Sequence, residues 1–242
     1  MQQLSYSQLW AYWTCPRLSD YLRQPTLRLA PSGVQEAGQW GARVHQILHR
    51  ASLSEAAESL PEVQTLMADS PQIWSGYQEV IQKQPVKAQV YSEWEIAVPL
   101  PVAWQLPYLL TGRIDRLWVE GAHCRILDWK TGQGKDSDAT RFQLRFYAWL
   151  VAFGHQALNL ACVESVQAEA HFLTTGDSVS LTLQTDRLAS ETDFFKTLIQ
   201  RYDTQRHQEL QGIPDPRSTS EGPWCTMCEY QRLCPEGRYH AQ

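Results

Sequence analysis

Two acidic residues and a lysine lie on neighbouring segments that each have the composition of a β-strand. Asp115 belongs to the first segment, and Asp128 and Lys130 belong to the second. Residues two apart on a strand project from the same face, and a hairpin would bring Asp115 to that face. Two carboxylates suit a hard divalent cation such as Mg²⁺ or Mn²⁺. Such a cation polarises a phosphodiester and lowers the pKa of a bound water, while the lysine orients that water or stabilises developing negative charge.

The same residues have a simpler interpretation as the charged rim of an ordinary hairpin. Asp128 and Lys130 would then form a surface ion pair. The neighbourhood favours a functional role, because Ile114, Leu117 and Ile126 are apolar. Charged groups at the end of apolar strands need a partner or a ligand, since their burial is otherwise costly.

Two helical segments carry further polar side chains that suit a site of this kind. Gln143 and Tyr147 are four residues apart, so they share one face of a predicted helix. An amide and a phenol there can hold a substrate phosphate or a base beside the metal. His45 follows Gly41 by about one helical turn and is a candidate metal ligand because of this company. A lone helical histidine more often has a structural role.

Charge limits how the protein can contact nucleic acid. The 242 residues carry a formal net charge of −5, whereas proteins that bind nucleic acid over a broad surface are usually basic. Binding is therefore predicted to be local. Arg113 and Arg116 flank Asp115 and are the predicted substrate-binding cations.

The order of predicted elements indicates an α/β fold with a central mixed sheet flanked by helices. The segment from Gly212 to Trp224 is rich in Pro, Ser and Gly and predicts a linker. Helices are expected over residues 5–14, 16–22, 55–82, 139–153 and 186–210 and from residue 34 onward, and strands over 90–98, 106–119, 123–130, 163–173 and 179–183.

A cytoplasmic location is expected, with no membrane association. No stretch approaches the roughly 20 apolar residues of a membrane helix, and the first residues lack the order of a signal peptide. Cytosolic thiols stay reduced, so the six cysteines are predicted to be metal ligands or core residues.

Four cysteines form a candidate ligand set. Cys225, Cys228 and Cys234 are closely spaced near the end of the chain, and Cys15 is a fourth candidate far away in sequence. Four thiolates hold either an iron–sulfur cluster or a zinc ion. In the zinc alternative, His240 would complete a set of three cysteines and one histidine.

The other two cysteines are predicted to be buried, inert core thiols. Cys124 lies in a predicted strand, and Cys162 lies near the end of a helix.

Together these motifs resemble the RecB-like branch of the PD-(D/E)XK nuclease superfamily, in particular its members with an iron–sulfur cluster. Those members include CRISPR-associated exonucleases and the AddB nuclease domain. The resemblance covers nearly the whole chain, and its specificity comes from the order of six short motifs. They are Ser5 to Arg17, Gly41 to His45, Gly112 to Asp115, Asp128 to Lys130, Gln143 to Tyr147 and Cys225 to Cys234.

The resemblance implies a restriction-endonuclease-like core and specific roles for its residues. His45, Asp115 and Asp128 would bind the metal, and Asp115, Asp128 and Lys130 would be catalytic. Ile114 replaces the proline of the superfamily's name, and Asp128 stands where Glu is common. Both variants fit the RecB-like branch.

The resemblance also implies that the four cysteines hold a cluster, usually [4Fe–4S], that joins the C-terminal tail to the N-terminal helices. Residues 1–242 would form one nuclease domain, with 1–35 and 211–242 as its cluster subdomain.

The implied activity is DNA hydrolysis by an exonuclease or end-processing nuclease in repair, recombination or CRISPR adaptation. DNA is the implied partner, with a helicase or CRISPR adaptation proteins as possible others. The alternative is a non-catalytic module that binds DNA or a partner, with a structural iron–sulfur or zinc site.

Overall fold

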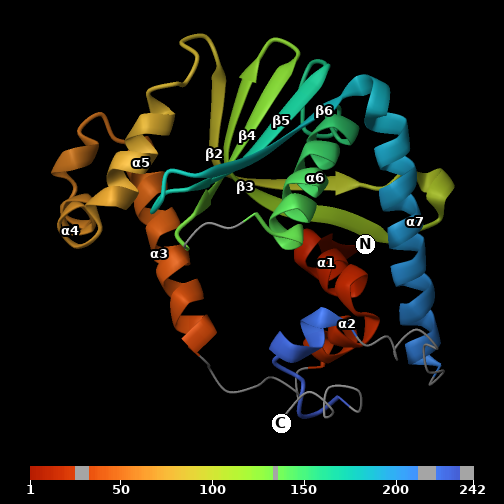
Figure 1. Cartoon of the computed structure of the whole chain (residues 1–242). Helices are drawn as coiled ribbons and strands as arrows, with labels where there is room; N and C mark the ends of the chain where they lie inside the picture. Colours follow the sequence, from red (N-terminus) through yellow and green to blue (C-terminus); the bar gives the residue numbers. More distant parts are fainter. Residues whose placement is uncertain (25–32, 133–135, 212–221, 235–242) are drawn as a thin grey trace.

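A six-stranded mixed sheet forms the centre of the protein (Figure 1). The computed structural model describes residues 1–24, 33–132, 136–211 and 222–234. Most of the predicted linker, residues 212–221, lies outside this part. The strands are β1 (Gln2–Ser5), β2 (Gln89–Pro99), β3 (Tyr108–Glu120), β4 (His123–Lys130), β5 (Ser165–Phe172) and β6 (Ser178–Gln184).

Helices flank the sheet, as predicted from the order of elements. The α-helices are α1 (Tyr6–Thr14), α2 (Pro16–Arg23), α3 (Gly33–Ser52), α4 (Pro61–Asp69), α5 (Pro71–Ile81), α6 (Asp138–Phe153) and α7 (Thr185–Leu210). The 3₁₀ helices are η2 (Ala57–Ser59), η3 (Val102–Trp104) and η5 (Pro223–Met227). None of the helices within the described residues is long and apolar enough to span a membrane.

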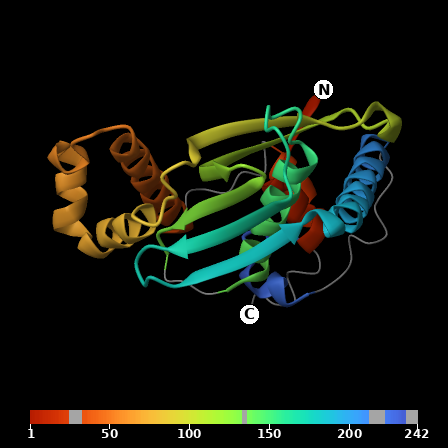
Figure 2. The same cartoon turned by 90° about the horizontal axis from the view of Figure 1, so that it is seen from above.

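Two hydrophobic cores form, one with each group of helices. Helices α1, α6 and α7 pack into the larger core with residues of β1 to β6. Helices α3, α4 and α5 form the smaller core, together with Trp118, Leu127 and Trp129 of β3 and β4. Figure 2 shows α3 to α5 grouped at one side of the sheet and α7 at the other.

Local signals explain where several helices begin. Ser5 and Gln8 form a reciprocal capping box at the start of α1, in which the Ser5 backbone N–H donates to Gln8 Oε1 at 2.8 Å. The predicted helical stretch 55–82 divides into η2, α4 and α5. Pro61 and Pro71 each occupy the first turn of a new helix, because proline has no N–H to donate inside one.

Two details differ from the sequence predictions. β1 was not predicted, and it pairs in parallel with Tyr108 to Thr111 of β3. Cys124 is buried as predicted, but the prediction of a buried Cys162 is wrong because its side chain is exposed. Cys162 lies in the connection between α6 and β5, where Leu158, Leu160 and Val163 are the buried apolar residues instead.

Glu169 on β5 is a buried carboxylate with two partners. Arg125 Nη2 donates to its Oε2 at 2.7 Å, and His171 Nδ1 lies 3.4 Å from its Oε1. These interactions, first that with His171, outweigh burial and lower the pKa of Glu169 to about 2. A depressed folded pKa stabilises the protein above the ordinary Glu pKa, and this stabilisation is lost as pH falls toward 2.

We therefore expect Glu169→Gln to lower the free energy of unfolding by about 3 kcal/mol at pH 7. The difference from the wild type should shrink as the pH falls from about 5 to about 2. Urea unfolding at a series of pH values measures it. Glu164→Gln is the control, because Glu164 is exposed at the start of the same segment. An equal deficit of Glu169→Gln at pH 7 and pH 3 would contradict the pKa argument.

Candidate active site

The candidate site lies where one edge of β3 changes its partner strand. β1 pairs with this edge as far as Thr111, and β4 pairs with it from Arg116 onward. Residues 112–115 therefore have no strand partner on this side. α1 leaves β1 at the same level, and the end of β4 diverges from β3 there. Several side chains and backbone groups can meet in this opening.

Asp115 and His45 form hydrogen bonds with the backbone N–H and C=O of Trp129. These groups have no partner on β3, because β3 and β4 diverge there. The Trp129 N–H donates to Asp115 Oδ2 at 2.7 Å, and the Trp129 carbonyl accepts from His45 Nε2 at 2.9 Å. His45 Nδ1 lies 3.1 Å from Asp115 Oδ1. Helix α3, β3 and β4 are thus linked through two side chains.

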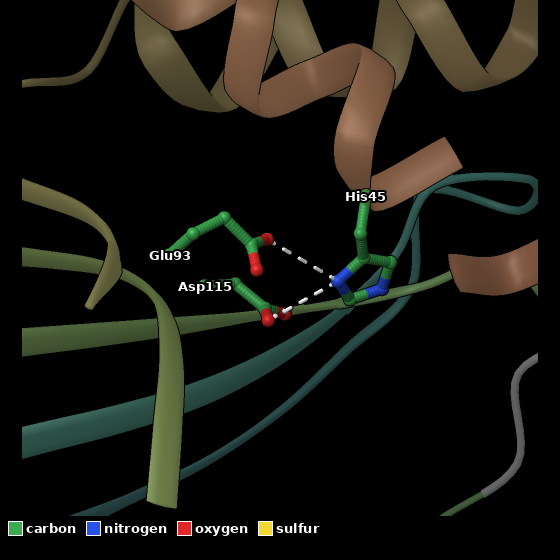
Figure 3. A group of neighbouring side chains, drawn as sticks. All are labelled: His45, Glu93 and Asp115. Atoms are coloured by element: carbon green, nitrogen blue, oxygen red, sulfur yellow. Dashed lines mark hydrogen bonds and ion pairs between the residues drawn. The ribbon is translucent and has the colours of Figure 1, made fainter. Parts of the chain in front are cut away.

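Glu93 on β2 joins His45 and Asp115 in a compact group (Figure 3). Its Oε1 lies 3.7 Å from His45 Nδ1, so both carboxylates approach the same ring nitrogen. Burial of His45 opposes protonation, but Asp115 and Glu93 overcome this effect and raise its pKa to about 10. Without a cation, a protonated His45 neutralises part of the local negative charge.

The backbone of Glu93 is unusual for a strand residue. Its φ angle is +49°, in the left-handed region that non-glycine residues rarely adopt. Glu93 is opposite Asp115, and the regular pairing is interrupted there, between Ser92–Arg116 and Trp94–Ile114. Such strain costs about 1–3 kcal/mol and concentrates at functional sites. Sequence analysis missed Glu93, because only the register of β2 against β3 reveals its position beside Asp115.

Asp128, Lys130 and Gln143 form a closed set of contacts beside this group. Lys130 Nζ lies 2.7 Å from Asp128 Oδ2 and donates to Gln143 Oε1 at 2.8 Å. The Gln143 amide donates to Asp128 Oδ1 at 2.7 Å. Burial, followed by the charge of Asp115, raises the pKa of Asp128 to about 6, and Lys130 opposes this rise. Gln143 of α6 therefore contacts both the acid and the lysine of β4 directly, a contact that the sequence did not predict.

Tyr147 packs against β3 at a position that only glycine permits. A Cβ atom at Gly112 would lie 2.5 Å from Tyr147 Cε1. The Arg113 backbone N–H donates to the Tyr147 hydroxyl, and the Tyr6 ring lies 5.6 Å from the Tyr147 ring. Gly112 thus sets how closely α6 approaches β3.

A cavity of about 590 Å³ opens over His45, Asp115 and the contacts of Asp128, whereas Glu93 is not part of its lining. Arg116 is absent from its lining: this side chain is buried, and its Nη2 donates to Gln84 Oε1 at 2.8 Å. The other residues predicted for the nuclease site line the cavity together, namely His45, Arg113, Asp115, Asp128, Lys130, Gln143 and Tyr147.

The predicted cysteine ligands also come together, although they lie at opposite ends of the chain. Burial raises the pKa of the Cys15 thiol, and the nearby Cys225 and Cys234 raise it further. Burial likewise raises the pKa of Cys228, and the other three thiols add to this. In Figure 1, η5 lies beside α2, consistent with a ring separation of 5.2 Å between Tyr21 and Tyr230.

Each of these four sulfur atoms receives an N–H group. The Leu18 and Arg17 backbones donate to Cys15, and the Tyr230 backbone donates to Cys228. The Gly222 N–H lies 3.5 Å from Cys225 Sγ, and Arg17 Nη1 lies 3.7 Å from Cys234 Sγ. Such donors stabilise thiolates that ligate a metal. His240, the zinc alternative, lies outside the described residues.

The α/β fold and the acidic group of His45, Glu93 and Asp115 fit the class of metal-dependent nucleases. The model of the PD-(D/E)XK nuclease superfamily matches residues 3–235, so the chain belongs to this superfamily. Membership indicates a hydrolase that acts on phosphodiester bonds of nucleic acid, with a divalent metal site.

Two further comparisons add no functional assignment. None of the curated proteins matches the sequence. Among solved structures, the chain is similar to the crystal structure of SSO0001, at 13% sequence identity and a TM-score of 0.43. The match covers 97% of this chain and 86% of that one.

Proposed function

We propose that this protein is a deoxyribonuclease of the RecB-like branch, an exonuclease or end-processing enzyme that requires Mg²⁺ or Mn²⁺. The observation that carries the proposal is the convergence of Asp115, Asp128 and Lys130 on one cavity at the opening in β3. DNA repair, recombination or CRISPR adaptation would use this activity, with a helicase or adaptation proteins as partners.

The donor set fits a hard divalent cation. Asp115 and Asp128 supply carboxylate oxygens, and His45 supplies a ring nitrogen. The Trp129 carbonyl oxygen lies beside them, 2.9 Å from His45 Nε2. Glu93 adds a third carboxylate. A cation held there would supply Lewis-acid polarisation of the phosphodiester and acidify water. His45 would have to lose a proton to act as a ligand, so metal binding should release protons.

The chain's own residues would position the substrate and handle charge. Asp128 and Gln143 hold the Lys130 ammonium in place, where it can orient the attacking water or neutralise developing charge. Arg113 and Tyr147 border the same cavity and can bind the phosphate. Arg116 would contribute to substrate binding only indirectly, because its hydrogen bond with Gln84 joins β3 to the segment that follows α5.

The contribution of Glu93 to metal affinity can be tested against a matched variant on the same strand. We expect Glu93→Ala to weaken Mn²⁺ binding roughly tenfold, because it removes one of three carboxylates from the site. Glu95→Ala should leave affinity unchanged, since Glu95 is exposed two residues further along β2. Calorimetric titration with Mn²⁺ measures the affinities. Equal affinities of the two variants would remove Glu93 from the ligand set.

Cleavage itself is tested on linear single-stranded and double-stranded DNA. The wild type should degrade DNA with Mg²⁺ or Mn²⁺ and stop when EDTA is added. DNA binding without cleavage under every metal condition would instead favour the non-catalytic module.

We further propose that Cys15, Cys225, Cys228 and Cys234 ligate a [4Fe–4S] cluster, with 1–35 and 211–242 as its subdomain. The N–H groups on all four sulfurs support this. Within the described residues, no three of these thiols lie within 4.8 Å of one another. Iron and zinc analysis of the purified protein therefore distinguishes a cluster from a zinc ion.

A further inference from the structure

Three aromatic residues of α1 connect the metal cavity to a second cavity. Tyr6, Trp10 and Trp13 follow the spacing of one helix face. Tyr6 lines the metal cavity, whereas Trp10 and Trp13 line a separate cavity of about 500 Å³. This volume lies within the range of about 300–1,000 Å³ typical of ligand sites.

Helix α6 packs alongside α1 and runs antiparallel to it. Its Tyr147 packs against Tyr6 at 5.6 Å, and its Phe142 packs against Trp10 at 5.3 Å between ring centroids. Gln143 lines the metal cavity, while the adjacent Phe142 lines the second one. The two cavities therefore share the α1–α6 interface as a common wall.

The second cavity exposes flat side chains that a folded protein usually covers. Trp13 is 51% exposed and Trp224 is 39% exposed. The Arg145 guanidinium lies 3.8 Å from the centre of the Phe194 ring, where Glu191 holds it at 2.6 Å. We call this cavity, lined by Trp10, Trp13, Phe142, Phe194 and Trp224, the aromatic groove.

We propose that the aromatic groove binds unpaired bases of a single DNA strand whose backbone passes through the metal cavity. The proposal rests on the proposed nuclease function and specifies its substrate as single-stranded. Indole and guanidinium planes stack on bases without regard to sequence. Bases in a duplex are already stacked on each other, so they cannot use such surfaces.

Charge at the groove supports stacking more than phosphate binding. Arg145 is paired with Glu191, and Arg141 at the rim is paired with Asp136. Both arginines are therefore already paired with a carboxylate, so they contribute little to the neutralisation of phosphates. Affinity contributed by the groove should therefore depend weakly on salt.

The test compares single-stranded and duplex DNA of the same length. Binding of a fluorescein-labelled thymidine oligonucleotide of about 15 nucleotides, and of its duplex with deoxyadenosine, is measured by anisotropy in EDTA. Trp13→Ala and Trp224→Ala should each weaken single-strand binding roughly tenfold and duplex binding less than about twofold. Trp13→Phe should restore most of the affinity, because it restores an aromatic face.

The control is Trp104→Ala, since Trp104 packs against Phe153 at the other end of α6. It should bind both DNAs like the wild type. In cleavage assays, Trp13→Ala should raise KM for single strands and leave kcat unchanged.

Separate outcomes overturn the inference and the proposed function. Unchanged single-strand affinity and KM in Trp13→Ala would overturn the groove assignment, even if the enzyme cleaves DNA. Unchanged affinity, together with the loss in Trp13→Ala of a dimer that the wild type forms in solution, would overturn it in favour of a second copy of the chain at the groove. A wild type that never cleaves would refute the nuclease proposal, while the binding comparison would still test the groove.

Discussion

Lys130→Ala is expected to bind Mn²⁺ as the wild type does and to cleave DNA about 10²–10³-fold more slowly. The ammonium lies 2.7 Å from Asp128 Oδ2 and is held by Gln143, so it is fixed beside the metal ligands. Its removal takes away a charge that stabilises the transition state. It takes away no ligand, and loss of a nearby positive charge does not reduce attraction for a cation.

The measurement pairs Mn²⁺ calorimetry with single-turnover cleavage of DNA at saturating metal. Lys83→Ala is the matched control, because Lys83 pairs with Glu79 on the exposed surface at the end of α5. It should change neither quantity. Undiminished cleavage by Lys130→Ala would refute the proposed mechanism, and loss of Mn²⁺ binding would show that Lys130 acts on the metal site instead.

Cys15→Ser is expected to remove the cluster and destabilise the whole protein. With Cys15 as a ligand, the cluster closes a loop of roughly 210 residues between α2 and η5. In the entropy model for cross-links, a loop of this length is worth about 5 kcal/mol. Binding of the cluster and folding of the two ends should be coupled. The variant should therefore be colourless and should melt at a lower temperature.

Anaerobic purification followed by iron analysis, absorption spectroscopy and thermal unfolding measures these effects. Limited proteolysis should show faster loss of the C-terminal tail in Cys15→Ser. The control is Cys162→Ser, because Cys162 is an exposed thiol outside the proposed set and should keep full colour. If Cys15→Ser kept its iron while Cys162→Ser lost it, the ligand assignment would be wrong. A colourless wild type containing zinc would refute the iron–sulfur cluster.

Most elements of the fold could be predicted because their signals are local. The capping box at Ser5, the prolines at helix starts and the apolar runs of β3 and β4 all act within a few residues. β1 could not be predicted in this way. It has four residues and a single buried one, Leu4, and it exists through pairing with Tyr108 to Thr111, which lie about a hundred residues away along the chain.

The sequence by itself determined which residue types could form the site. Asp128 and Lys130 share a strand face, and Gln143 and Tyr147 share a helix face, because backbone geometry dictates both spacings. These residues, with His45, Arg113 and Asp115, line one cavity.

Tertiary structure alone decided the remaining features. Glu93 joins the site because β2 places it opposite Asp115, and Arg116 leaves it because its side chain turns toward Gln84. The aromatic groove likewise depends on α1 and α7 meeting α6. Contacts between distant segments depend on strand register and helix packing, and neither is encoded in the spacing of neighbouring residues.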